Sequence, residues 1–156
     1  MTKLRAFLKF WLPVLLWMAL IFSASSDSHS YQHSSRFFEP FLHWLFPNMS
    51  SDHIEAIHHF IRKCGHLMEY AVLALLLWRA LHLSKNNLPD WSWPKVGGTL
   101  LIVFLYAASD EFHQSFVPTR TARVSDLFID TAGGTLGLLV LGFFNHCRNH
   151  RRIKAK

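Results

Sequence analysis

The sequence has little charge for its length. Asp, Glu, Lys and Arg together make up 17% of the 156 residues, whereas a soluble globular protein has about 25%. Hydrophobic residues account for 51% and aromatic residues for 15%. So few charges cannot cover the surface of so large an apolar core, and the same composition excludes a disordered or collagen-like chain. The composition therefore predicts a membrane protein.

Cysteine is also scarce, and basic residues outnumber acidic ones. Two cysteines, Cys64 and Cys147, are too few for a small disulfide scaffold. They fall at opposite ends of predicted spans, too far apart for a disulfide. The basic excess, 16 Lys and Arg against 10 Asp and Glu, gathers at the two termini rather than along one face. We therefore expect no nucleic-acid partner.

Four long apolar runs are present, at residues 6–22, 67–83, 96–116 and 126–144. Each is about as long as the 17–25 residues that a helix needs to cross a bilayer. The runs are continuous rather than alternating, which favours helices over strands. The sequence predicts an all-α fold, a polytopic transmembrane helix bundle of about four spans. It forms a single domain over residues 1–156, with short interfacial helices on the outer side.

Basic residues before the first run and after the last predict that both termini are cytoplasmic, which requires an even number of crossings. Arg120 and Arg123 fall on the outer side in this arrangement, although basic residues are usually enriched on the cytoplasmic side. The first run has an alternative interpretation as a cleaved signal peptide ending at the small residues 23–25. Cleavage would leave the orientation of the later spans unchanged.

The segment between the first two spans is expected to lie along the outer surface. Residues 23–35 are polar and rich in serine, and residues 36–46 have the aromatic density typical of a helix in the membrane interface. Asp52 and Glu55 have the spacing of a capping box. Ile54, Ile57 and Ile61 then mark one face of a predicted short helix that leads into the second span.

Polar residues gather at the outer ends of the last three predicted spans. A charge facing lipid near the bilayer centre costs at least about 2.5–3.5 kcal/mol, so we expect these side chains to face a shared pocket that opens outward. The alternative is that each one lies at the headgroup level and is solvated. The candidate ligand-binding residues are Lys63, His66, Glu69, Tyr70, Asp110, Glu111, Gln114, Arg120, Asp126 and Asp130.

A stripe of small residues follows the acids of the fourth span. Gly133, Gly134 and Gly137 have the spacing that lets a neighbouring helix approach closely. Asp130 lies on the same face and is therefore expected to point toward the helix interface. Ser125 is the predicted N-cap of this helix.

Several segments in order resemble the VanZ-like family. They are residues 63–71 (KCGHLMEYA), 109–114 (SDEFHQ), 116–120 (FVPTR) and 125–126 (SD), followed by Asp130 and Gly133. The resemblance covers about residues 60 to 140. It implies a small multi-pass protein of the bacterial cytoplasmic (inner) membrane, associated with resistance to the glycopeptide teicoplanin. No established reaction comes with it.

The resemblance also implies which residues form the family's motif: Lys63, His66, Tyr70, Asp110, Glu111, Gln114, Arg120 and Asp126. Thr119 stands where family members commonly have glycine, which argues against a tight glycine turn there. Asp130 stands where many have asparagine, and it adds a negative charge to the predicted pocket.

These residues favour a binding protein over an enzyme. Lys63 and Arg120 can grip a phosphate or carboxylate, the arginine through a bidentate fork. We therefore expect the chain to bind an anionic envelope lipid, such as a polyprenyl-phosphate-linked precursor, or a glycopeptide target. The partners are membrane lipid and this ligand, and no cofactor is expected.

The alternative is a membrane-embedded hydrolase or transferase. His66 would act as its general base, or His66 and the acids would bind a divalent metal. The sequence lacks HExxH and nucleophile-elbow motifs, and we predict no resident metal. A transporter is disfavoured because the inner half of the spans has no polar path. Arg79, the main polar residue there, can reach the cytoplasm by snorkelling.

Overall fold

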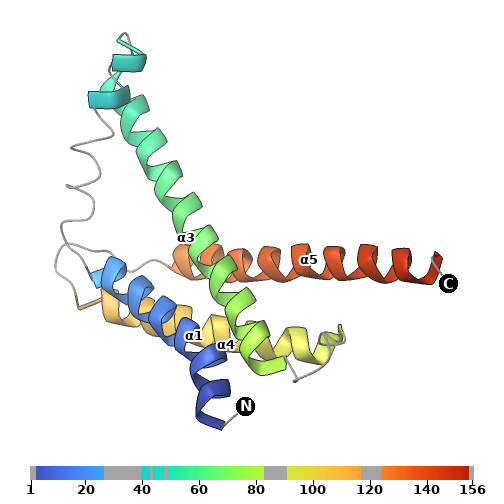
Figure 1. Cartoon of the computed structure of the whole chain (residues 1–156). Coiled ribbons are helices and arrows are strands. Elements are labelled where there is room, and N and C mark those ends of the chain that lie inside the picture. The colour runs from blue at the N-terminus through green and yellow to red at the C-terminus, as the bar shows by residue number, and fades with distance from the viewer. Residues whose placement is uncertain are drawn as a thin grey trace.

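The computed structural model describes residues 3–26, 40–42, 44–47, 49–82, 91–116 and 124–154. Within these ranges the long elements are all helices: α1 (Lys3–Ser26), α3 (Ser51–His82), α4 (Trp93–Gln114) and α5 (Val124–Lys154) (Figure 1). The predicted all-α helical bundle is confirmed. Residues 40–42 and 44–45 are also helical, inside the predicted interfacial segment, and residues 36–39 of that segment lie outside the described residues.

Helix α1 runs antiparallel to α3. The indole nitrogen of Trp17 donates a hydrogen bond of 2.9 Å to the carbonyl of Glu69. Nearer the start of α1, the guanidinium of Arg79 donates one of 3.3 Å to the carbonyl of Lys9. A residue later in α1 thus contacts one earlier in α3, so the two helices point in opposite directions.

Helix α4 runs parallel to α1 and antiparallel to α3. The hydroxyl of Tyr106 donates a hydrogen bond of 2.6 Å to the carbonyl of Met18. At the other end of α4, Thr99 lies 3.3 Å from the ring nitrogen of His82. The directions therefore alternate from α1 to α3 to α4.

Glycines let α5 cross closely over α3, and this is the most extensive helix contact among the described residues. A Cβ on Gly133 would lie 2.2 Å from the carbonyl oxygen of Leu67, and one on Gly137 would lie 2.7 Å from that of Ala71. The predicted close approach at the glycine stripe is confirmed. The later glycine of α5 meets the later residue of α3, so α5 runs in the same direction as α3 where the two helices cross (Figure 1).

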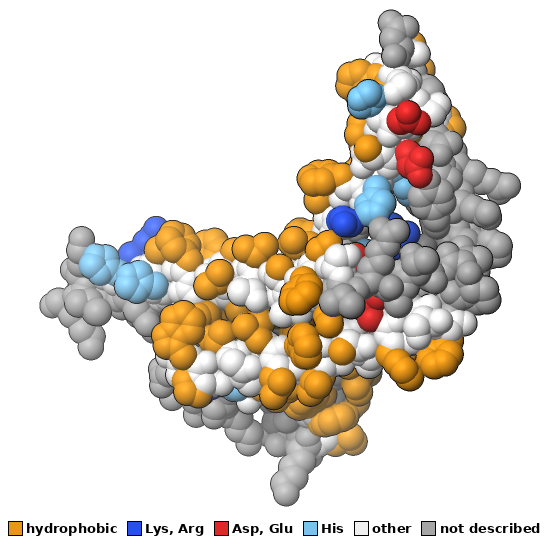
Figure 2. All heavy atoms as spheres, turned by 180° about the vertical axis from the view of Figure 1, so that it is seen from behind, with side chains coloured by type: hydrophobic (Ala, Val, Ile, Leu, Met, Phe, Trp, Pro, Cys, Tyr) orange, Lys and Arg blue, Asp and Glu red, His pale blue; other side chains and the backbone are white. Residues whose placement is uncertain are grey.

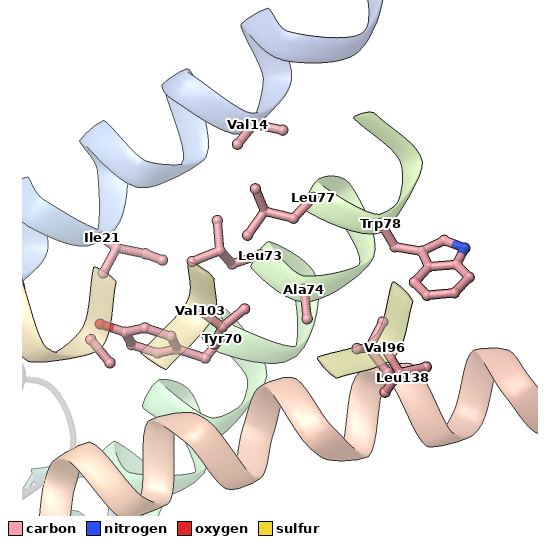
Figure 3. Close-up of a cluster of buried hydrophobic side chains, with 11 residues drawn as sticks. Val14, Ile21, Tyr70, Leu73, Ala74, Leu77, Trp78, Val96, Val103 and Leu138 are labelled. Carbon is pink, nitrogen blue, oxygen red and sulfur yellow. The ribbon is translucent and has the colours of Figure 1, made fainter. Parts of the chain in front are cut away.

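The core lies where the four helices meet. Leu73, Ala74 and Leu77 of α3 are buried between side chains of the other three helices (Figure 3). Helix α1 contributes Val14 and Ile21, which are fully or almost fully buried. Helix α1 is therefore packed into the core.

The outer faces of the helices are apolar. Leu12, Leu16 and Leu20 of α1 and Phe143 and Phe144 of α5 are all exposed. An apolar surface of this kind suits contact with lipid. Within a bilayer, close van der Waals packing, rather than a hydrophobic effect between helices, holds such a core together.

Three of the described helices are long and apolar enough to cross a membrane: α1 over Phe7–Ser25, α3 over Ser51–His82 and α5 over Ser125–Arg148. Helix α4 is not among them, although its 22 residues correspond to about 33 Å, the thickness of the hydrocarbon layer. It contains Asp110 and Glu111 in its last turns. The crossing of α4 therefore remains a prediction.

Three local predictions about helix ends were wrong. Helix α3 begins at Ser51 because the carbonyl of Ser50 accepts the backbone N–H groups of His53 and Ile54 at 3.1 and 3.2 Å. Asp52 therefore lies in the first turn rather than at the cap. With no proline between residues 51 and 82, the predicted short helix and the second span form one continuous helix of 32 residues. Helix α5 begins at Val124, so Ser125 lies inside it rather than at its N-cap.

Candidate functional site

Most of the predicted site residues meet where α1 and α4 end and α5 begins. We call this group, together with Ser25, the polar cluster. Its position follows from the helix directions, because the alternation brings the end of α1, the end of α4 and the start of α5 to the same end of the bundle (Figure 1). Its members are Ser25, His66, Glu69, Tyr70, Asp110, Glu111, Gln114, Asp126 and Asp130.

One half of the cluster joins α1 to α4. The hydroxyl of Ser25 donates a hydrogen bond of 2.8 Å to Oδ2 of Asp110. Gln114, one turn further along α4, donates 3.0 Å to the same oxygen and also donates to the hydroxyl of Ser25. Asp110 is 1% exposed and Gln114 4%. This buried triangle fixes the end of α1 against the end of α4.

The other half joins α3 to α5. Nδ1 of His66 lies 3.8 Å from a carboxylate oxygen of Glu69 and 3.9 Å from Oδ1 of Asp130. Gly133 lies three residues after Asp130 and brings the backbone of α5 against Leu67, which places the acid next to His66. Asp130 is 2% exposed, whereas the side chains of His66 and Glu69 are 23% and 29% exposed. His66 and Glu69 therefore connect the buried acid to the surface.

The two halves are close enough for their charges to act on each other. The negative charges of Glu111, Asp110, Asp126 and Glu69 all disfavour the charged form of Asp130. Helices α3, α4 and α5 thus contribute acids to a common region, as the depth of the polar residues in the sequence predicts.

Tyr70 lies within the same electrostatic region. Its side chain is fully buried, its ring centroid lies 6.2 Å from that of Tyr106, and the group interacts with Asp130 and Asp110. Its ring is part of the apolar core, and its hydroxyl is near enough to the acids of the cluster to interact with their charges.

Three buried oxygen atoms of the cluster have no hydrogen-bond partner among the described residues. They are the hydroxyl of Tyr70, Oδ1 of Asp110 and Oδ1 of Asp130. A buried polar atom left without a partner costs about 1–3 kcal/mol, and such atoms are rare in folded proteins. These three belong to different helices, α3, α4 and α5. Three helices of the cluster therefore each carry a buried oxygen with free hydrogen-bonding capacity.

The predicted cations are placed differently from the acids. Lys63 lies one turn before His66 on α3, on the part of the helix that extends beyond the others. There it lines a shallow hollow with His59, Phe60 and Ala56 and with the acids Asp52 and Glu55. Figure 2 shows acidic, basic and histidine side chains along this extension. Arg120 and Arg123 lie outside the described residues. Among the predicted cations, only Lys63 is therefore located by the structure.

Sequence reasoning missed two residues of this region. Ser25 was considered only in the alternative interpretation, as part of a signal-peptide cleavage site, although a small polar residue at the end of an apolar run can also be a buried hydrogen-bonding group. Tyr106 was not singled out, although it lies one turn before Asp110 and bonds to the backbone of Met18. Both contacts are long-range pairings that spacing along one helix does not reveal.

The donor set suits hydrogen bonding better than metal binding. Across the described residues, no three His, Cys, Asp or Glu side chains are grouped to hold one metal ion. Both cysteines are free, with Cys64 exposed and Cys147 partly buried.

The chain matches a known protein family. The sequence profile of the VanZ/LLP1 family matches residues 10–145, which covers most of the chain. All ten predicted site residues fall within it. No curated protein and no solved structure matches the chain. The chain therefore belongs to the VanZ/LLP1 family.

Proposed function

We propose that this protein binds an anionic envelope lipid or cell-wall precursor at the end of the bundle that bears the polar cluster, on the outer side of the membrane. Membership of the VanZ/LLP1 family supports a membrane protein linked to glycopeptide resistance. The observation that carries the proposal is the convergence of polar side chains from α1, α3, α4 and α5 at this one end, in helices whose other surfaces are apolar. Buried ionisable groups in membrane helices are costly to keep without a function.

The orientation rests on four crossings. The contacts support it, because α1 and α4 run one way and α3 and α5 the other, as successive crossings require. If α4 did not cross, the basic residues at the two termini would lie on opposite sides of the membrane. Four crossings put both ends in the cytoplasm of a bacterial inner membrane and the polar cluster outside.

The anion is bound on the extension of α3. Lys63 provides a flexible ammonium group for a phosphate oxygen, and the neighbouring Arg62 and His59 add cationic capacity on the same helix. His66 lies one turn further in, held between Glu69 and Asp130 at 3.8 and 3.9 Å. A headgroup on this extension lies at the entrance to the cluster.

The same His66 supports a second candidate function. A histidine beside a buried carboxylate resembles a general base that is oriented by an acid. The alternative is therefore a hydrolase or transferase acting on a polyprenyl-phosphate-linked substrate, with His66 as base and Asp130 as its orienting group. Release of phosphate or of a transferred group by the wild type, lost in His66→Ala, would establish it over simple binding.

The binding proposal is tested with the full-length chain in nanodiscs. Lys63→Ala is expected to weaken binding of added polyprenyl phosphate by roughly tenfold, which corresponds to the loss of one charge-assisted hydrogen bond. Arg148→Ala is the matched control, because it removes a cation from the other end of α5, where the guanidinium contacts Asn145. Equal binding by wild type and Lys63→Ala would contradict the proposal.

A further inference from the structure

Carboxyl groups predominate among the titratable side chains of the polar cluster, as they do in sites that bind cations. Five carboxyl groups meet in it, and His66 is the one side chain among its members that can become positive. Ionised carboxylates in a region of low dielectric repel one another strongly, and a cation between them removes that repulsion. A phosphate bound at Lys63 cannot provide this compensation. A cation bound in the cluster would therefore stabilise the charged form of its acids.

The three unpartnered oxygens define the kind of cation. The hydroxyl of Tyr70, Oδ1 of Asp110 and Oδ1 of Asp130 come from three helices, and each belongs to a side chain that is more than nine-tenths buried. A primary ammonium group has three N–H donors, which matches the number of these acceptors. A quaternary ammonium has no N–H donor and leaves all three oxygens unpartnered.

A metal ion fits these residues less well. The second oxygen of Asp110 already accepts hydrogen bonds from Ser25 and Gln114, which hold that carboxylate in place. The described residues do not group three strong metal ligands around one point. A hydrogen-bonding cation needs acceptors from several directions, and α3, α4 and α5 provide them.

We infer that the polar cluster binds the primary ammonium group of a headgroup whose phosphate lies at Lys63. The inference rests on the proposed function and narrows its ligand to one whose headgroup carries a primary amine beside its phosphate. His66 and Glu69 are the partly exposed members of the cluster, so they mark the side from which the amine reaches the buried Asp130. The acids and the cation of α3 thus recognise opposite ends of one headgroup.

The test compares three lipids with the same acyl chains by native mass spectrometry of the full-length chain in detergent. Phosphatidylethanolamine has a primary amine, phosphatidylcholine has a quaternary one, and phosphatidylglycerol has none. We expect phosphatidylethanolamine to bind roughly tenfold more tightly than phosphatidylcholine. Asp130→Asn and Tyr70→Phe should each remove this preference and leave phosphatidylglycerol binding unchanged. Both substitutions are nearly isosteric and spare the bonds of Asp110.

Asp52→Asn is the control: it removes an exposed acid that lines the hollow of Lys63 but is not part of the polar cluster, so it should leave the preference for the primary amine unchanged. Equal binding of the two amine lipids to the wild type would overturn the inference, as would an unchanged preference in both cluster variants. Lys63→Ala separates the two proposals. If it leaves all three lipids bound as before while Asp130→Asn removes the preference, the phosphate site fails and the ammonium site stands.

Soluble phosphoethanolamine distinguishes a free headgroup from a lipid. Displacement of phosphatidylethanolamine by phosphoethanolamine but not by phosphocholine supports recognition of the amine by the headgroup alone. If neither displaces the lipid and the preference still depends on Asp130, the ammonium site stands and its ligand is the membrane lipid. Displacement by phosphocholine as effective as by phosphoethanolamine would overturn the inference.

Discussion

Arg79 of α3 donates a hydrogen bond of 3.3 Å to the carbonyl of Lys9 in α1. In a regular helix this carbonyl accepts the N–H of the residue four positions later, which here is Pro13, and proline has no N–H. The guanidinium also lies 5.5 Å from the ring centroid of Phe10. Helix α3 thus supplies the donor that α1 lacks at its proline.

Replacing Arg79 with Met should therefore destabilise the protein through α1. We expect a loss of about 0.5–1.5 kcal/mol, the net value of one hydrogen bond. In a Pro13→Ala background, where residue 13 again donates to Lys9, the same substitution should cost less. A double-mutant cycle of unfolding free energies in detergent measures the coupling. Strictly additive effects would show that Arg79 does not act through the Lys9 carbonyl.

Gly133→Ala should weaken the crossing of α3 and α5. The new Cβ would lie 2.2 Å from the carbonyl oxygen of Leu67, a backbone atom that cannot turn away. We expect a loss on the order of 1–3 kcal/mol, typical of overpacking, in reversible unfolding with a denaturing detergent. Gly98→Ala is the control, because nothing lies within 4 Å of its Cβ position. Equal stability of the two variants would contradict the observed packing.

Ser25→Ala should separate the end of α1 from α4. The substitution removes the bond to Asp110 and an acceptor for Gln114, so we expect a loss of about 1–3 kcal/mol. Ser23→Ala, at an exposed position, should have little effect. The measurement also tests the signal-peptide alternative. An intact mass that lacks the first 25 residues would refute the role of α1 in the folded protein.

Thiol labelling checks the orientation. In intact spheroplasts an impermeant thiol reagent should modify Cys64, which is exposed on the outer part of α3, and spare Cys147 near the inner end of α5. Permeabilised cells should label both residues, and Cys64→Ser should abolish the signal in intact ones. Labelling of Cys147 alone would invert the proposed orientation.

The helices and their polar ends were predictable because the signals are local. A charge in an apolar run is costly in lipid, so Asp110 and Asp130 had to turn inward, and glycines beside an acid mark a close helix contact. Both expectations agree with the buried acids and with the contact of Gly133 with Leu67. Helix direction and depth were enough to bring these residues to one end.

The pairings between helices were not predictable, because they depend on which side chain meets which backbone atom. Ser25 lies 85 residues from Asp110 in sequence, and Tyr106 lies 88 residues from Met18. The ends of α3 and α5 were also misjudged, because Ser50 takes the role that was assigned to Asp52, and α5 starts a residue before its expected cap. Capping patterns place a helix end only to within a few residues.

The length of α3 has one more consequence. Its 32 residues correspond to about 48 Å, well beyond the roughly 30 Å of bilayer hydrocarbon. If the last turns of α3 lie at the inner surface of the membrane, its first turns extend beyond the hydrocarbon layer into the water on the outer side. A molecule too bulky or too hydrophilic to enter the membrane can therefore meet the protein in water before any part of it reaches the acids below.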